Sequence, residues 1–121
     1  MTVEEYRKLA AKPAKYRNKR VVNACGRFDS VKEYDRWCEL RSLELIGVIA
    51  DLRRQVRYEI IPAQYGADGK LLENAAVYTA DFVYERNGDT VVEDVKGVRT
   101  KDYILRRKLM LQVHGIRILE T

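Results

Sequence analysis

The sequence has few of the residues that form disulfides, zinc sites and histidine-dependent active sites. Its 121 residues contain two cysteines and one histidine. Cys25 and Cys38 have neither the CxxC nor the Cys/His spacing of a zinc site, so we interpret both as free thiols. A Ser–His–Asp triad would have to use His114. This residue precedes Gly115 at an expected helix end, where an imidazole can simply face the last carbonyls. We therefore expect neither zinc chemistry nor a histidine-based triad.

Long apolar runs and a secretory signal pattern are also missing. We therefore expect no membrane association and a reducing, cytoplasmic location. The length predicts a single domain with a real core. Hydrophobic residues make up 46% and charged residues 34%, which is typical of a globular protein with a highly charged surface. The net charge of +5 favours an acidic partner, most commonly nucleic acid, although many basic proteins bind no polyanion.

One folded domain is predicted over residues 21–121, preceded by a basic N-terminal arm over residues 1–20. The arm is rich in Lys and Arg and has no sustained apolar period. Two interpretations of it stay open, a phosphate-binding arm and a solvated tail. No internal repeat, low-complexity segment or further domain boundary is evident in the sequence.

Two helices are predicted from apolar residues at helical spacing and from residues typical of helix ends. The first begins at Ser30 and closes at Gly47. The second is capped by Thr100 and ends at Gly115. Both are expected to pack on a sheet through one apolar face.

Strands are predicted near residues 55–61, over residues 74–86 and 90–97, and over residues 116–120. The Asn-Gly pair at 87–88 separates two strand-like runs and predicts a β-hairpin. The last strand returns through a helix and is expected to pair in parallel. The fold class is therefore α/β, close to α+β, with a small mixed sheet flanked by helices.

Charged side chains interrupt the strand after the hairpin, where they are costly unless paired or bound to a metal. Side chains alternate along a strand, so Asp94 and Lys96 share one face while Glu93 and Val95 share the other. A turn at the Asn-Gly pair, with a small bulge, brings Asp81 opposite Asp94. Two facing carboxylates repel unless they are protonated or bridged by a cation. Their oxygens favour Mg²⁺ or Mn²⁺.

Glu33 is a third candidate acid with two interpretations. On a helical wheel it lies on the same arc as Trp37 and Leu40, so it should point toward the sheet. The spacing Ser30-x-x-Glu33 is also that of a capping box, which needs no functional role. Both roles can coexist.

These acids carry a resemblance to a known superfamily. Asp81 followed by Asp94-Val95-Lys96 resembles the PD-(D/E)XK nuclease signature, with Ala80 in place of the proline. Three longer stretches resemble a family of small phage-encoded proteins in that superfamily: Phe28-Asp29-Ser30-x-x-Glu33, Tyr78-x-x-Asp81-Phe82, and Glu93-Asp94-Val95-Lys96-Gly97 followed by Thr100. The likeness runs from about Gly26 to Glu120. It implies an αβββαβ core like that of restriction endonucleases and Holliday-junction resolvases.

The resemblance also implies a role for each residue. Asp81 and Asp94 would hold Mg²⁺ or Mn²⁺ with help from the Val95 carbonyl, and the metal would lower the pKa of a bound water. Lys96 would stabilise charge on the phosphate in the transition state, unless it merely neutralises Asp94. Glu33 would orient a water, a second metal or the lysine. The expected product carries a 5′ phosphate.

Basic residues on the second predicted helix are candidates for DNA contact. They are Lys101, Arg106, Arg107 and Lys108. Their side chains would contact phosphates or form an ordinary solvated helix face.

The resemblance implies a metal-dependent endodeoxyribonuclease that acts in phage replication or recombination, in the cytoplasm of a bacterial host. A branched substrate follows by analogy, and cleavage of a four-way junction would need two active sites and hence a homodimer. The alternative is a non-catalytic nucleic-acid-binding phage accessory protein with the same fold. That alternative accounts for the basic charge but not for the convergence of Asp81, Asp94 and Lys96.

Overall fold

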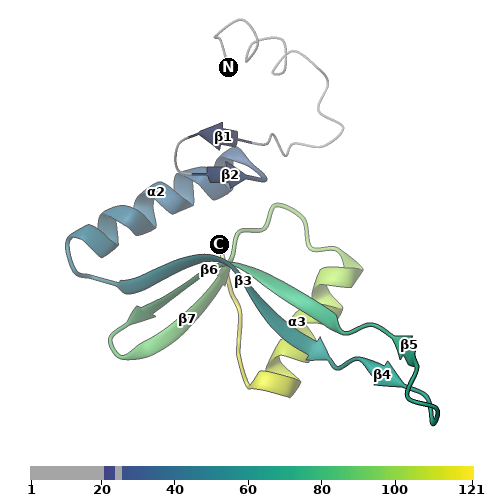
Figure 1. Cartoon of the computed structure of the whole chain (residues 1–121). Helices are drawn as coiled ribbons and strands as arrows, with labels where there is room; N and C mark the ends of the chain where they lie inside the picture. Colours follow the sequence, from purple (N-terminus) through teal and green to yellow (C-terminus); the bar gives the residue numbers. More distant parts are fainter. Residues whose placement is uncertain (1–20, 24–25) are drawn as a thin grey trace, which may run out of the picture. The chain divides into compact units, whose positions relative to one another are not determined.

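The computed structural model describes residues 21–23 and 26–121 (Figure 1). The predicted N-terminal arm, residues 1–20, and Cys25 lie outside the described residues, so the structure does not bear on either prediction. None of the helices in the described part of the chain is long and apolar enough to cross a membrane.

The chain divides into two compact units, and each is described by itself. The first ends at Arg36 and the second begins at Trp37. In the first unit, β1 (Val21–Asn23) and β2 (Gly26–Phe28) pair as an antiparallel ribbon. The helix α2 (Val31–Leu45) begins in the first unit and ends in the second.

The second unit is built on a four-stranded mixed sheet. Its elements are β3 (Ala50–Ile61), β4 (Gln64–Tyr65), β5 (Leu71–Glu73), β6 (Ala76–Arg86), β7 (Asp89–Asp94), α3 (Lys101–His114) and β8 (Leu119–Glu120). The strand order is β3, β6, β7, β8, in which β8 pairs with β7 in parallel and the other pairs are antiparallel (Figure 1). The predicted mixed sheet with flanking helices and a parallel last strand is confirmed, with a β4–β5 ribbon added.

Two apolar clusters form the core of the second unit. In one, Tyr103 and Met110 of α3 pack with buried side chains of the sheet such as Tyr78. In the other, Leu40 of α2 packs with Phe82 of β6 and its neighbours. Each of these side chains is at most 5% exposed. Full burial of such a large side chain stabilises the fold by about 1.5–3 kcal/mol, so the two helices are held against the sheet at separate places.

The ends of α3 follow the predicted signals. Thr100 is extended and its hydroxyl accepts a hydrogen bond of 3.1 Å from the backbone N–H of Tyr103, which satisfies a donor in the first turn. Gly115 has φ 66°, a left-handed conformation that glycine adopts without a Cβ clash. The N–H of Gly115 bonds back to the Leu111 carbonyl at 3.0 Å. The Thr100 cap therefore fixes the point at which the segment after Lys96 enters α3.

The β6–β7 hairpin turns at Asn87-Gly88, as predicted. Both residues have positive φ, 53° and 83°, which is typical of a type I′ turn. Arg86 and Asp89 form the closing pair, and the register then runs without a shift to Phe82 and Glu93. The predicted small bulge was wrong, because the two-residue loop matches the strand twist without an extra residue.

The alternation of side chains between the two faces of the sheet is interrupted where Gln55 of β3 lies level with Asp81 of β6. The flanking pairs are Arg54 with Phe82 and Val56 with Ala80, so Gln55 and Asp81 are level with each other. Ala80 packs in the cluster with α3, whereas Phe82 packs in the cluster with α2. Residues two apart on a regular strand share a face, so the alternation breaks at this point. Gln55 has φ 52°, which turns the strand locally.

The start of β3 was predicted too late. The strand begins at Ala50, five positions before the predicted start near residue 55. Asp51 also has positive φ, 54°, and the β3–β6 register shifts between Ala50 and Arg53. Burial still alternates along β3, but Arg54 occupies a half-buried position where the pattern would call for an apolar residue, so the sequence of this half shows no clear alternation.

Candidate metal centre

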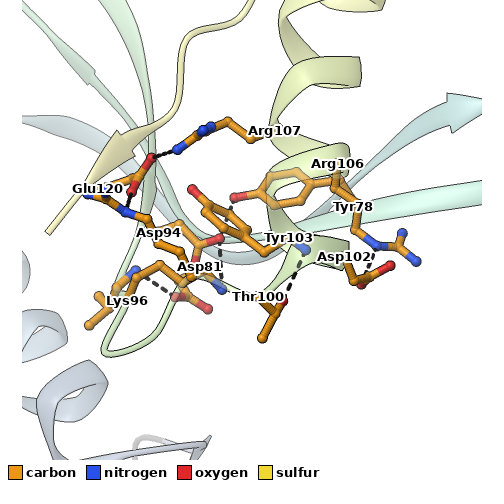
Figure 2. A network of polar contacts seen from close by, with 12 residues as sticks. Tyr78, Asp81, Asp94, Lys96, Thr100, Asp102, Tyr103, Arg106, Arg107 and Glu120 are labelled. Carbon is orange, nitrogen blue, oxygen red and sulfur yellow. Dashed lines mark hydrogen bonds and ion pairs between the residues drawn. The ribbon is translucent and has the colours of Figure 1, made fainter.

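The register of the hairpin brings Asp81 and Asp94 together. Phe82 pairs with Glu93, so the next pair in the same register is Asp81 with Asp94. The backbone N–H of Val95 donates a hydrogen bond of 2.9 Å to Oδ2 of Asp81. Figure 2 shows Asp81, Asp94 and Lys96 within one network of polar contacts. The Asp81 carboxylate is thus tied to the backbone between Asp94 and Lys96.

Asp94 is almost fully buried and is fixed by two side chains. It is 2% exposed. The hydroxyl of Tyr78 donates to its Oδ2 at 2.7 Å, and Nζ of Lys96 lies 3.3 Å from the same oxygen. Burial raises the pKa of Tyr78, and the charge of Asp94 raises it further. Tyr78 therefore stays protonated and donates to Asp94. Both contacts use Oδ2, which leaves Oδ1 available to a further ligand.

Lys96 is held between Asp94 and an aromatic ring. Its side chain is 29% exposed, so it meets solvent while it contacts the buried carboxylate. Its Nζ lies 4.4 Å from the ring centroid of Tyr103 in α3, a cation–π distance. Burial and then the charge of Glu120 raise the pKa of Tyr103. The ammonium group of Lys96 is thus positioned by residues of two different elements.

Glu120 extends the row of acids across the next strand, and sequence reasoning missed it. In the parallel β7–β8 pair, Glu120 is level with Asp94. Arg107 donates to its carboxylate at 2.9 Å, and Arg99 forms a second ion pair with it. The Arg107 hydrogen bond and the charge of Arg99 outweigh burial and hold the pKa of Glu120 below its ordinary value. Gln55, Asp81, Asp94 and Glu120 therefore form one polar row across all four strands of this sheet.

The C-terminal residue fastens β8 beside the row. The N–H of Thr121 donates to the Asp94 carbonyl at 3.0 Å, and its carbonyl accepts from the N–H of Lys96 at 3.1 Å. At the other end of the row, Nε2 of Gln55 lies 3.5 Å from Oδ1 of Asp81. The two aspartates are thus bonded to β3 on one side and to Thr121, which follows β8, on the other.

Glu93, the other acid of this strand, points to the opposite face. It is 0% exposed and accepts a hydrogen bond of 2.8 Å from the hydroxyl of Tyr84. The hydroxyl of Thr121 donates to its other oxygen at 3.3 Å. Tyr84 belongs to the cluster that contains Leu40 of α2. Glu93 therefore lies on the face of the sheet that packs on Leu40 of α2, away from Lys96.

Glu33 makes the contacts of a helix cap. Its N–H donates to the hydroxyl of Ser30 at 3.0 Å, and its carboxylate accepts from the N–H of Asp29 at 3.2 Å. This is the exchange expected of a capping box, with the carboxylate reaching one residue further back. Glu33 lies in the first compact unit, whereas Asp81 and Asp94 lie in the second. Its proposed role at the site stays a prediction.

The four predicted DNA-contact residues do not form one patch. Lys101 is exposed at the start of α3. Arg106 is engaged by Asp102 at 3.0 Å and by the carbonyl of Val77. Arg107 and Lys108 instead line a groove further along α3. Their roles in DNA contact stay predictions.

The two facing aspartates supply the kind of ligand that Mg²⁺ or Mn²⁺ requires. Within residues 21–23 and 26–121, no group of three or more His, Cys, Asp or Glu side chains is arranged to hold a metal ion. Mg²⁺ commonly binds through one or two carboxylates and keeps several waters or substrate oxygens. Asp81, Asp94 and the carbonyl of Val95 fit that pattern, because all three are oxygen donors.

The comparison with protein families gives a single assignment. A family model described as "Protein of unknown function (DUF1064)" matches residues 13–117, most of the chain. The chain belongs to the DUF1064 family. The match covers Asp81, Asp94 and Lys96, and it ends before Glu120. No curated protein and no solved structure matched this DUF1064 chain.

Proposed function

We propose that this DUF1064 protein is a metal-dependent endodeoxyribonuclease of the PD-(D/E)XK type. The observation that supports it most is the hydrogen bond of 2.9 Å from the Val95 N–H to Asp81. It joins the acid of one strand to the Asp94-Val95-Lys96 segment of the next, which is the arrangement that the resemblance implies. A solvated strand edge has no need of a buried aspartate beside a second one.

The aspartates have the role of holding the metal in this proposal. A Mg²⁺ or Mn²⁺ ion bound by Asp81, Asp94 and the Val95 carbonyl would supply a water of lowered pKa and a positive charge for the phosphate. Tyr78 keeps Oδ2 of Asp94 occupied at 2.7 Å. This contact fixes the orientation of the carboxylate, so its other oxygen faces the ligand.

Lys96 has the role of stabilising charge on the scissile phosphate. Its ammonium group is 3.3 Å from Asp94 and rests over the Tyr103 ring, so little rearrangement is needed when substrate binds. A preorganised cation lowers the barrier more than a mobile one. Hydrolysis would leave a 5′ phosphate, as the resemblance implies.

Glu33 is kept as a proposed site residue on the resemblance alone. Its hydrogen bonds with Ser30 and Asp29 show that Glu33 caps the helix, whether or not it also acts at the site. As a site residue it would orient a water, a second metal or Lys96. A Glu33→Gln change separates the two roles, since the amide oxygen can still accept from the Asp29 N–H.

DNA is the proposed substrate, and a branched form of it is proposed by analogy with junction resolvases. The net charge of +5 supports a polyanionic substrate. Cleavage of a four-way junction would require a homodimer with two active sites. We also propose that the protein works in the cytoplasm of a bacterial host during phage replication or recombination.

The alternative function is a non-catalytic nucleic-acid-binding protein with the same fold. One observation favours it: the described residues contain no group of three or more acidic, His or Cys side chains arranged for a metal. Under this alternative, Lys96 neutralises Asp94 and the row of polar residues is structural.

The test is a cleavage assay with the full chain on linear, single-stranded and four-way-junction DNA. Reactions contain Mg²⁺, Mn²⁺ or EDTA, and Asp81→Asn is compared with wild type. We expect cleavage of at least one DNA in metal, none in EDTA, and none by Asp81→Asn. DNA binding without any cleavage would support the alternative, and equal cleavage by Asp81→Asn would overturn the site.

A further inference from the structure

A groove beside α3 gathers cations that the proposed metal site does not use. It has a volume of about 640 Å³ and lies between α3 and the C-terminal segment that leads into β8. Its cationic side chains are Arg99, Arg107, Lys108 and Arg117. Glu120 is the one acid that lines it. The volume falls in the range of about 300–1,000 Å³ found for ligand sites.

The cations of the groove are of two kinds. Arg99 and Arg107 are both paired with Glu120, so their guanidinium groups are held in place before any ligand binds. Lys108 and Arg117 are exposed and form no ion pair with the described residues. Cations without a partner at the mouth of a concave site attract an anionic ligand, because concave walls focus their field.

The floor of the groove is apolar. Leu111 is 56% exposed and Leu119 is 45% exposed, and Ile116 lies beside them in the lining. Exposed apolar side chains surrounded by charge mark a binding surface more often than a plain solvated face. A ligand that fits must therefore offer negative charges and apolar surface at once.

We propose that this groove binds an unpaired strand of nucleic acid. Phosphates would meet the four cations, and the faces of unpaired bases and sugars would lie on the leucine floor. A duplex stacks its base faces internally and presents mainly phosphates and groove edges, so it cannot use the floor. Charge and apolar surface together thus favour a single strand.

The groove adjoins the candidate metal centre through Glu120. This residue lines the groove and is level with Asp94 in the β7–β8 pair. A strand in the groove would therefore lead toward the aspartates. The inference rests on the proposed function to this extent: it names DNA with an unpaired segment as the preferred substrate of that same site.

Binding of a labelled single-stranded DNA oligonucleotide to the full chain, measured by fluorescence anisotropy in EDTA, tests the groove without cleavage. The variant Lys108→Ala/Arg117→Ala removes two groove cations. The control Arg57→Ala/Lys70→Ala removes two exposed cations outside the groove and gives the same net charge. Thermal melts of all variants check that the fold is kept.

The groove variant should bind the single strand about tenfold more weakly than wild type, while the control changes little. Each phosphate contact adds about 0.7 to the slope of log K against log salt, so the slope should fall by about 1.4. Leu111→Ser should weaken binding without a change in slope, because an apolar contact releases no counterions. Duplex DNA should bind more weakly than the single strand.

Equal losses in the groove and control variants would overturn the proposal, as would absent binding or a preference for duplex DNA. A dimer in sedimentation that the groove variant dissociates would assign the surface to a second copy instead. If the groove variant alone loses single-strand binding but the wild-type protein cleaves no DNA, the nuclease proposal is overturned and the groove proposal stands. An unchanged cleavage rate in the groove variant would overturn the groove proposal and leave the nuclease proposal standing.

Discussion

Glu93 and Asp94 are neighbours in the chain, and each is buried with a tyrosine hydroxyl donating to it. Tyr84 donates to Glu93 at 2.8 Å and Tyr78 donates to Asp94 at 2.7 Å. Exposure does not distinguish them, because the values are 0% and 2%. The face of the sheet on which each acid lies distinguishes them. Glu93 accepts from Thr121 on the face of the sheet that packs on Leu40, whereas Asp94 lies on the other face with Lys96 at 3.3 Å.

Burial alone therefore does not mark a functional acid. Hydroxyl donors can satisfy a buried carboxylate, so the burial of Glu93 by itself indicates no function. Asp94 also faces a second acid, Asp81, across the hairpin and contacts a half-exposed cation. Like charges kept close and buried cost free energy, so their retention favours a ligand that offsets the cost. Matched changes at the two positions test whether the two acids differ in function.

The largest contrast is expected between Asp94→Asn and Glu93→Gln. Loss of a metal ligand removes several kcal/mol of transition-state stabilisation, so Asp94→Asn should lower the cleavage rate by about 10³-fold or more. Glu93→Gln keeps an acceptor for Tyr84 and should leave the rate per folded molecule close to wild type. Cleavage rates in Mg²⁺ at saturating DNA measure both. Equal losses would show that the two acids are not functionally distinct.

A smaller loss is expected from Lys96→Met. Removing one preorganised charge typically costs about 10²–10³-fold in the catalytic rate constant, and the methionine keeps the packing on Tyr103. The control is Lys70→Met, which removes an exposed cation from the turn between β4 and β5. Single-turnover kinetics should show the loss in the rate constant rather than in DNA affinity. If the Lys96→Met protein keeps full activity, Lys96 only neutralises the charge of Asp94 and does not act on the phosphate.

The two tyrosines should behave alike in stability and differently in activity. Tyr78→Phe and Tyr84→Phe each remove a hydrogen bond to a buried carboxylate, which costs about 1–3 kcal/mol in the free energy of unfolding. Urea titration of both variants measures this cost. Only Tyr78→Phe should also slow cleavage, because only Tyr78 orients Asp94. A slower Tyr84→Phe protein with intact Tyr78 would contradict the separation of the two faces.

The smallest expected effect is on how the free energy of unfolding falls at acidic pH when Glu120 is changed to Gln. Arg107 and Arg99 lower the pKa of Glu120 below its ordinary value of 4.5. A lowered pKa means that the folded state binds the proton less tightly than the unfolded state. The contribution is therefore present above about pH 4.5 and lost as the pH falls through the folded value. Urea titrations from pH 7 to 3 should show a shallower acid loss in Glu120→Gln than in wild type. Identical curves would exclude the ion pairs as a source of stability.

Much of the fold was predictable because its signals are local. Asn87-Gly88 encodes a two-residue turn, and a turn of fixed length sets the register on both strands. Counting from that turn is enough to bring Asp81 level with Asp94. Thr100 and Gly115 mark the ends of α3 through their own hydrogen bonding and backbone conformation.

The missed features depend on contacts that no local pattern reports. Gln55 adopts a positive φ although it is not glycine, so the face change beside Asp81 leaves no trace in the sequence. Glu120 reaches the site through a parallel strand of two residues, and no turn fixes the register of such a strand. Its ion pairs with Arg99 and Arg107 join segments far apart along the chain.

Calorimetric titration of the full chain with Mn²⁺, in the absence of DNA, measures metal binding at Asp81 and Asp94 directly. Wild type and Glu93→Gln should bind the ion with similar affinity, because Glu93 lies on the other face. Asp94→Asn should bind it at least about tenfold more weakly, since one of two carboxylate ligands is gone. Equal Mn²⁺ affinity in wild type and Asp94→Asn, or no binding by wild type, would contradict the account.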